Sequence, residues 1–352
     1  MLDQNFELSS EESVKSIVIV ENYLSVALVK IDENSHGIIN QSISSDIAKK
    51  LSDDLVKELH ENLTNNPNIQ KINLEGLECS DKHLESLAPH LENLRDLTTL
   101  SLTNNKIELS KTPDFVKILK NIPAFKEIDF SGNPISSRGL EVLSDLLQSN
   151  PSIESLYLRN IKIDDEKSQI LSQNLKENST LKNLDLQYNH DLNDNYFNEM
   201  LKYNTTILNI KITNFQSRAN QNSFIEKLNR NKKIDIFINE NSSIFDEKIL
   251  AKAINASVKI HEGVATEPDF LLLHESLNNP DFFKNPLNQE EAKEKLFQFY
   301  RAIKIDENSI KTIENLALDK DHRPQKPQNK IPTSTLRKML GSCFGGRGNS
   351  QS

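Results

Sequence analysis

The stretch LTTLSLTNNKI, residues 97–107, decides the fold of this chain. Its apolar residues stand at positions 1, 4, 6 and 11 of the stretch, and Asn stands at position 9. Five such units in one register are hard to obtain by chance, so the chain is predicted to be a repeat protein. The units follow one another at a constant step of 28 residues and begin at Ile69, Leu97, Phe125, Ile153 and Leu181.

A stretch with helical spacing follows each unit. After the unit that begins at Phe125, for example, Leu140, Leu143 and Leu147 recur at intervals of three and four residues, which is typical of a helix packed on one side. One strand followed by one helix cannot bury its own apolar face, so neighbouring units are expected to stack.

The residue at position 9 is expected to hold the turn of each unit. The amide of an Asn at this position can form hydrogen bonds with backbone N–H and C=O groups of the turn that would otherwise have no partner. Units in which Leu77, Ile161 or Phe215 replaces the Asn are expected to be less regular, because packing alone must do this work.

The pattern weakens toward both ends of the repeat region. Downstream, Ile207 begins a unit after only 26 residues, and residues 236–241 are interpreted as a last, frayed unit. Upstream, residues 26–34 form either a degenerate first unit or part of a hairpin made by 16–20 and 24–31. Either arrangement would cap the stack, which solenoids require.

The repeats resemble a known family. The stretch 97–107 and the stretch GLEVLSDLLQSNPSIESLYLRNIKI, residues 139–163, are similar to leucine-rich repeats of the ribonuclease-inhibitor type. Repeats of this type also occur in NOD-like receptors, Ran GTPase-activating protein and tropomodulin. The resemblance implies an α/β leucine-rich repeat solenoid, with a curved parallel sheet inside and helices outside. It is specific for fold and unspecific for function.

Four segments are predicted. Residues 1–43 are an N-terminal cap, and 44–243 are the solenoid, with about six to seven repeats of 26–28 residues. Residues 244–318 are a small α-helical domain or cap, with helices expected over 245–256, 268–278, 289–304 and 308–318. Residues 319–352 change in composition and are predicted to be a disordered basic tail.

Composition and motifs exclude several classes of function. The net charge of −9 argues against a nucleic-acid partner. The acidic N-terminus lacks the pattern of a secretory signal, and no apolar run is long enough to span a bilayer. The two cysteines, Cys79 and Cys343, cannot make a disulfide framework, and they suit a reducing cytoplasm. No nucleotide, zinc-protease or hydrolase motif is present, so neither a cofactor nor enzymatic activity is expected.

Polar residues on the inner strand face are the candidate site. Positions 5, 7 and 8 of each unit are expected to face the concave side of the sheet. Aromatic and arginine side chains are the residues that most often anchor protein interfaces. The alternative is a solvated polar face without a special patch. The predicted protein-binding cluster consists of Asp129, Tyr157, Arg159, Asp185 and Tyr188.

The basic tail carries a weaker signal. The segment TLRKMLGSCFGGRG, residues 335–348, combines apolar and basic residues, so it could contact an anionic membrane, and Cys343 could accept a palmitoyl chain. It could equally be a secretion signal, a binding peptide or an inert tail.

The sequence therefore predicts a non-enzymatic scaffold that binds a protein partner on its concave face. The Asn-, Lys- and Ile-rich composition resembles that of proteins from AT-rich genomes, including intracellular bacteria, which implies an effector that acts in the cytosol of a host cell. One alternative is a GTPase-activating regulator of the Ran GTPase-activator type. Another is an actin-capping protein of the tropomodulin type, which rests on fold analogy alone.

Overall fold

The computed structural model describes residues 16–18, 63, 68–284 and 289–318. The chain divides into two compact units, Met1–Lys232 and Lys233–Ser352, and each is described by itself. The division falls earlier than residue 243, where the repeat pattern fades in the sequence. It falls inside helix α7 (Arg218–Glu240), which contributes Phe224 to the core of the first unit and Phe237 to the core of the second.

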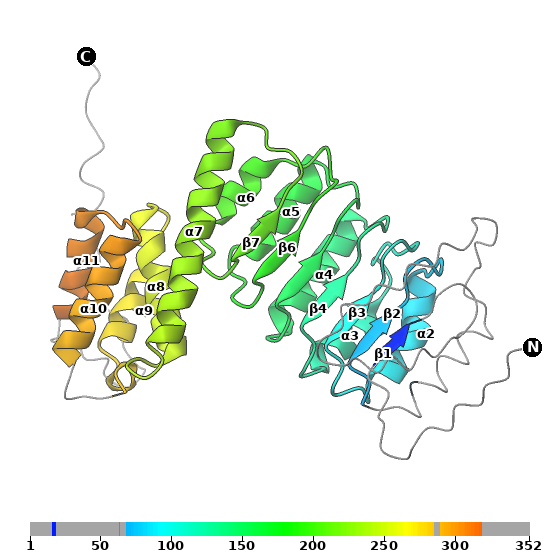
Figure 1. Cartoon of the computed structure of the whole chain (residues 1–352), viewed down its shortest axis with the longest axis horizontal. Helices are drawn as coiled ribbons and strands as arrows, with labels where there is room; N and C mark the ends of the chain where they lie inside the picture. Colours follow the sequence, from blue (N-terminus) through cyan, green and yellow to red (C-terminus); the bar gives the residue numbers. More distant parts are fainter. Residues whose placement is uncertain (1–15, 19–62, 64–67, 285–288, 319–352) are drawn as a thin grey trace, which may run out of the picture. The chain divides into compact units, whose positions relative to one another are not determined.

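A parallel sheet organises the first unit (Figure 1). Its seven described strands are three residues long and pair in the order in which they occur along the chain. The register matches position 4 of every repeat, so that Ile72, Leu100, Ile128, Leu156, Leu184 and Ile210 lie side by side. The strands are β1 (Ser16–Val18), β2 (Lys71–Asn73), β3 (Thr99–Ser101), β4 (Glu127–Asp129), β5 (Ser155–Tyr157), β6 (Asn183–Asp185) and β7 (Asn209–Lys211).

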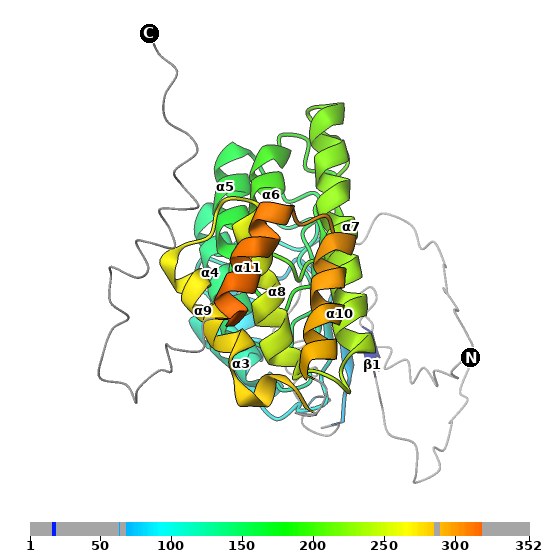
Figure 2. The same cartoon turned by 90° about the vertical axis from the view of Figure 1, so that its left-hand side faces the viewer.

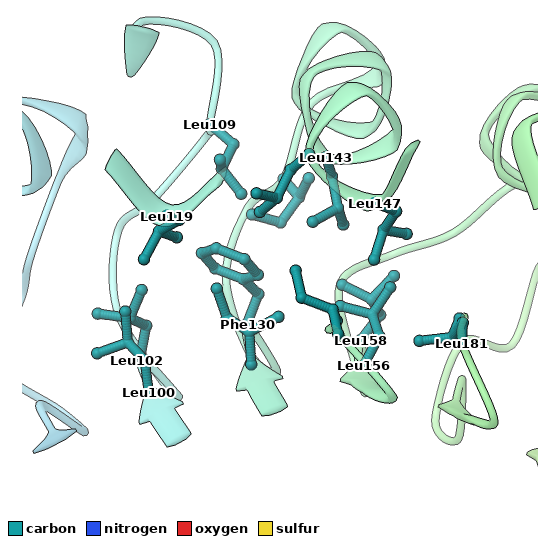
Figure 3. Close-up of a cluster of buried hydrophobic side chains, with 14 of the residues drawn as sticks. Leu100, Leu102, Leu109, Leu119, Phe130, Leu143, Leu147, Leu156, Leu158 and Leu181 are labelled. Carbon is teal, nitrogen blue, oxygen red and sulfur yellow. The ribbon is translucent and has the colours of Figure 1, made fainter. Parts of the chain in front are cut away.

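Helices connect the successive strands from β2 to β7 and cover one face of the curved sheet, while its other face is open among the described residues (Figure 1). The residue at the centre of each strand from β2 to β7 is buried, because it points toward the helices. Figure 3 shows Leu100 of β3, Phe130 just after β4 and Leu156 of β5 together with Leu119 and Leu143 from the helices. The connecting helices are α2 (Asp81–Leu91), α3 (Pro113–Asn121), α4 (Ser137–Ser149), α5 (Asp165–Leu175) and α6 (Asp194–Met200). This is a leucine-rich repeat type of α/β solenoid.

Buried asparagines join each repeat to the next. The Asn133 Oδ1 accepts the Ile107 N–H at 3.1 Å, and its Nδ2 donates to the carbonyls of Leu102 and Phe130 at 2.8 and 2.9 Å. Asn105 and Asn189 make equivalent bonds one unit before and two units after. The role predicted for the Asn at position 9 is therefore confirmed.

Units without this Asn are less regular, as predicted. The residue at position 8 has a positive φ in five successive units. In the units where Leu77 or Ile161 stands at position 9, the next residue, Glu78 or Lys162, is also left-handed, with φ of 54° and 56°. At Phe215 packing replaces the amide, because its ring meets that of Phe224 edge-on at 5.1 Å between centroids.

A second row of asparagines holds the turns that lead from helix to strand. The Asn178 Nδ2 donates to the Leu147 carbonyl at 3.1 Å, and its Oδ1 accepts the N–H groups of Thr180 and Leu181. Equivalent bonds recur at Asn150 and Asn204. Asn231 lies inside α7, and its Nδ2 donates to the carbonyls of Asn204 and Ile207 in the preceding turn.

The last predicted repeat is wrong. Residues 236–241 are not a strand, since α7 continues to Glu240. Buried residues recur every three or four positions along α7, while Ile236 is 54% exposed. They are Phe224, Leu228, Asn231, Ile234 and Phe237. This is a helical period. Ile236 is exposed while Ile238 packs against the core of the second unit, so the two do not share a face as residues two positions apart do in a strand.

The second unit is a bundle of helices around a core rich in aromatic residues (Figure 2). The ring of Phe237 stacks on that of Phe299 at 3.9 Å between centroids. Lys259 and Asp269 form a buried ion pair at 3.0 Å, which compensates both charges. The four helices predicted here are present, together with a short 3-10 helix (Pro280–Phe282). They are α8 (Glu247–His261), α9 (Glu267–Leu277), α10 (Gln289–Ala302) and α11 (Glu307–Leu318).

Two predicted segments lie mostly or wholly outside the described residues. Only Ser16–Val18 of the predicted cap at 1–43 are described, and they add β1 to the sheet beside β2. The predicted tail at 319–352, including Cys343, lies outside the described residues. Among the helices that the structure describes, none has the length and apolar content to cross a membrane.

Candidate functional site

The open face of the sheet brings position 5 of neighbouring repeats into one row. The register places Asp129 beside Tyr157, Tyr157 beside Asp185, and Asp185 beside Lys211. Adjacent parallel strands lie about 4.8 Å apart, so these side chains are within reach of their neighbours. We call Glu127, Asp129, Tyr157, Arg159, Asp185, Tyr188 and Lys211 the inner patch.

An ion cluster lies at the centre of the inner patch. The Arg159 Nε is 3.3 Å and the Lys211 Nζ is 3.7 Å from the Asp185 Oδ2. The contact with Arg159 is an ion pair without the alignment of a hydrogen bond. The Asp185 Oδ1 accepts the Gln187 N–H at 3.1 Å. The Asp185 side chain is only 3% exposed, against 41% for Arg159 and 62% for Lys211, so a buried carboxylate lies beneath two accessible cations.

The Tyr157 ring supports the arginine. The guanidinium carbon of Arg159 lies 5.5 Å from the centroid of this ring, which is within the range of a cation–π contact. Burial raises the pKa of the Tyr157 hydroxyl, and the negative charges of Glu127 and Asp129 raise it further, against the opposing effects of Ser155 and Arg159. The ring therefore stands between the acidic groups on β4 and the cation of Arg159, which follows just after β5.

Tyr188 occupies an unusual backbone position just past the end of β6. It has a φ of 64°, in the left-handed region, and its side chain is 55% exposed. The corresponding position 8 of earlier repeats is held by Gly76, Asn104, Gly132 and Asn160, which are residue types that tolerate this conformation. The Tyr188 N–H donates to the Thr213 Oγ1 at 2.6 Å, which ties this turn to the next repeat.

The structure brings together part of the predicted cluster. Tyr157, Arg159 and Asp185 are in contact, Asp129 is adjacent to Tyr157 across the sheet, and Tyr188 lies past the end of β6. Their role in binding a partner stays a prediction.

Sequence reasoning missed Lys211 as a member of this cluster. The signal was present, because Lys211 holds the same position 5 as Asp185 one repeat later. Lys211 was left out because the cluster was chosen for its tyrosines and arginine, with only Asp129 and Asp185 as flanking charges.

Other groups with chemical potential have structural environments. Burial raises the pKa of the Cys79 thiol to about 12, so it is protonated at neutral pH. The His261 Nδ1 lies 2.9 Å from Asp306, whose carboxylate also accepts from the Ser309 hydroxyl and N–H at the start of α11. Because Ser309 bonds to the carboxylate and not to the imidazole, this is a helix cap and not a nucleophile with its base. No cluster of three or more metal-ligating side chains occurs within the part of the chain that is described.

Comparison with known proteins finds solved structures that are similar to this chain, among them the two below. No protein-family model matches the chain, and no curated protein is similar to it in sequence. A solved structure of leiomodin-1 actin-binding site 2 has 17% identity and a TM-score of 0.39, and the match covers 53% of this chain and 96% of that one. The tropomodulin C-terminal domain of Caenorhabditis elegans has 16% identity and a TM-score of 0.36, with coverages of 43% and 93%. At these TM-scores the matches do not bear on function, and the fold rests on the register and burial described above.

Proposed function

We propose that the chain is a binding protein that holds a protein partner on the open face of its sheet. One observation carries the proposal: Arg159 is held at once by the Tyr157 ring and the buried Asp185, and still has 41% of its side chain exposed. An arginine fixed in this way loses little side-chain entropy when a partner binds it.

The composition of the inner patch supports the same role. Tyrosine and arginine are enriched among the residues that dominate interface energies. The patch lies on strands and just past their ends, and the asparagine bonds between repeats fix these strands relative to one another. The proposed role is recognition without catalysis.

Capture from a cell extract tests the proposal. The full chain is immobilised, and the retained proteins are compared by mass spectrometry with those retained by a Tyr157→Ala/Arg159→Ala double variant. The matched control is Tyr196→Ala/Arg138→Ala, which removes the same residue types from helices α6 and α4.

Proteins that bind the open face should be retained by the native chain and by the control, and lost from the inner-patch variant. Equal retention by the two double variants would show that the open face is not the binding surface. The predicted effector role in a host cell, GTPase activation and actin capping remain predictions, and the identity of the captured protein would separate them.

A further inference from the structure

Charge is divided across the inner patch. Glu127 and Asp129 lie on β4, at one side of the Tyr157 ring. The exposed cations Arg159 and Lys211 lie on the other side, just after β5 and on β7. Asp185 is buried between the two cations, so its single negative charge offsets one of them and leaves a net positive site at the surface.

The geometry of Arg159 suits a carboxylate ligand. Its Nε is the guanidinium atom that faces Asp185, and its plane lies near the Tyr157 ring. The two terminal amino groups are then placed to bind a carboxylate in the fork arrangement that guanidinium favours. Lys211 adds a second positive charge on the same side of the ring.

The division has a defined width. The acidic residues lie on β4, and the two cations lie on either side of β6. The distance from β4 to β6 is two strand spacings, or about 10 Å. An extended peptide advances about 3.3 Å per residue, so about three residues cover this distance.

We propose, resting on the protein-binding function above, that the inner patch binds an extended peptide segment with one basic and one acidic residue about three positions apart. The basic residue contacts Glu127 and Asp129, and the acidic residue contacts Arg159 and Lys211. Tyr157 packs between them, and Tyr188, which is exposed just past β6, borders the cationic side. The opposite charges on the two sides set the direction of the bound segment.

Selection from random peptides tests this proposal. A displayed library of peptides about ten residues long, enough to cross the sheet from β3 to β7, is selected on the full chain and on two variants. Arg159→Gln removes the cationic side and Glu127→Gln weakens the acidic side. The control Arg138→Gln removes a charge from the exposed surface of α4.

The native chain and the control should enrich peptides with a basic and an acidic residue about three positions apart. Arg159→Gln should lose the preference for the acidic residue, and Glu127→Gln should lose the preference for the basic one. Synthetic peptides from the selection should bind Arg159→Gln about tenfold or more weakly than the control, as measured by fluorescence polarisation. Arg159→Lys should fall between the two, because it keeps the charge and loses the fork.

Selected peptides without the charge pair would overturn the proposal, as would a pair that is enriched equally on all variants, or the absence of any enrichment. These outcomes are distinct from failure of the proposed function. A folded protein captured through Tyr157 and Arg159 would uphold that function even when no charged peptide is selected. Circular dichroism of each variant verifies that the fold is retained.

Discussion

Replacing Asn189 by alanine should destabilise the first unit more than any equivalent change in the same row of asparagines. The Asn189 Oδ1 accepts the N–H groups of Ile161 and Ile163 at 3.0 and 3.1 Å, and its Nδ2 donates to the carbonyls of Leu158 and Leu186 at 2.8 and 2.9 Å. The residue is 5% exposed, so water replaces these partners poorly. At about 1 kcal/mol or more for each buried group left without a partner, the loss is about 4 kcal/mol.

Asn133 provides the comparison within the same row. Its loss leaves the Ile107 N–H and the Phe130 carbonyl without this partner, but the Leu102 carbonyl still accepts from Asn105 at 2.9 Å. Asn133→Ala should therefore cost about 2 kcal/mol, or half as much. Asn183→Ala, a change on the half-exposed strand face, should cost less than about 1 kcal/mol.

Urea denaturation followed by circular dichroism measures these differences, because the chain has no tryptophan to report by fluorescence. Hydrogen exchange of peptides from 153–192 assigns the transition to the first unit. Equal losses for Asn189→Ala and Asn183→Ala would refute the reasoning, and so would a larger loss for Asn133→Ala than for Asn189→Ala.

Three further predictions test other features. In urea titrations Gly132→Ala should destabilise the first unit more than Gly76→Ala. Both glycines have a φ of 71°, which costs about 1–2 kcal/mol for alanine, but only at Gly132 would the new Cβ collide with the Asn104 side chain. Tyr188→Asn should raise stability by about 1 kcal/mol, because Asn tolerates the left-handed region better, and should weaken binding of selected peptides; a change in neither quantity would contradict the role given to this residue. Burial raises the pKa of Asp306, but hydrogen bonds from Ser309 and His261 outweigh burial and lower this pKa from 3.8 to about 2. The ionised carboxylate therefore stabilises the second unit above pH 3.8, and this stabilisation is lost as the pH falls toward 2. Asp306→Asn should make hydrogen exchange of α11 less sensitive to pH over this range, and an unchanged sensitivity would argue against it.

The repeat region was predictable because every turn of the solenoid solves the same burial problem. Residues at positions 1, 4 and 6 point into one continuous core, so the sequence repeats wherever the structure does. The prediction failed at residues 236–241, where two isoleucines two positions apart imitate a strand. The neighbouring residues do not distinguish Ile236 and Ile238 from Ile210 and Ile212, which do belong to the sheet region. Only the longer helical period of buried residues from Phe224 to Phe237 distinguishes the two pairs.

The candidate site was predictable in position and not in detail. Strand register alone places Tyr157 beside Asp185. The side-chain conformation that brings Arg159 to Asp185, by contrast, depends on side-chain packing. The left-handed backbone conformation of Tyr188 could not be predicted from residue preferences, because tyrosine seldom adopts this conformation. The glycines and asparagines at the same position of earlier repeats were the signal that could have revealed it.

The asparagine bonds between repeats also restrict how the chain can change in length. Each amide at position 9 reaches atoms one whole unit away, such as the Leu158 carbonyl bonded by Asn189. Removing 28 residues would bring the next asparagine to an equivalent carbonyl and leave the bonding intact. A deletion of another size would misplace the amide and the carbonyl on opposite sides of the cut, while pairs wholly before or after the cut would keep their spacing. Loss of one whole unit is therefore the change in length that these bonds tolerate best, and the 26-residue step before β7 leads into the unit where Phe215 replaces the asparagine.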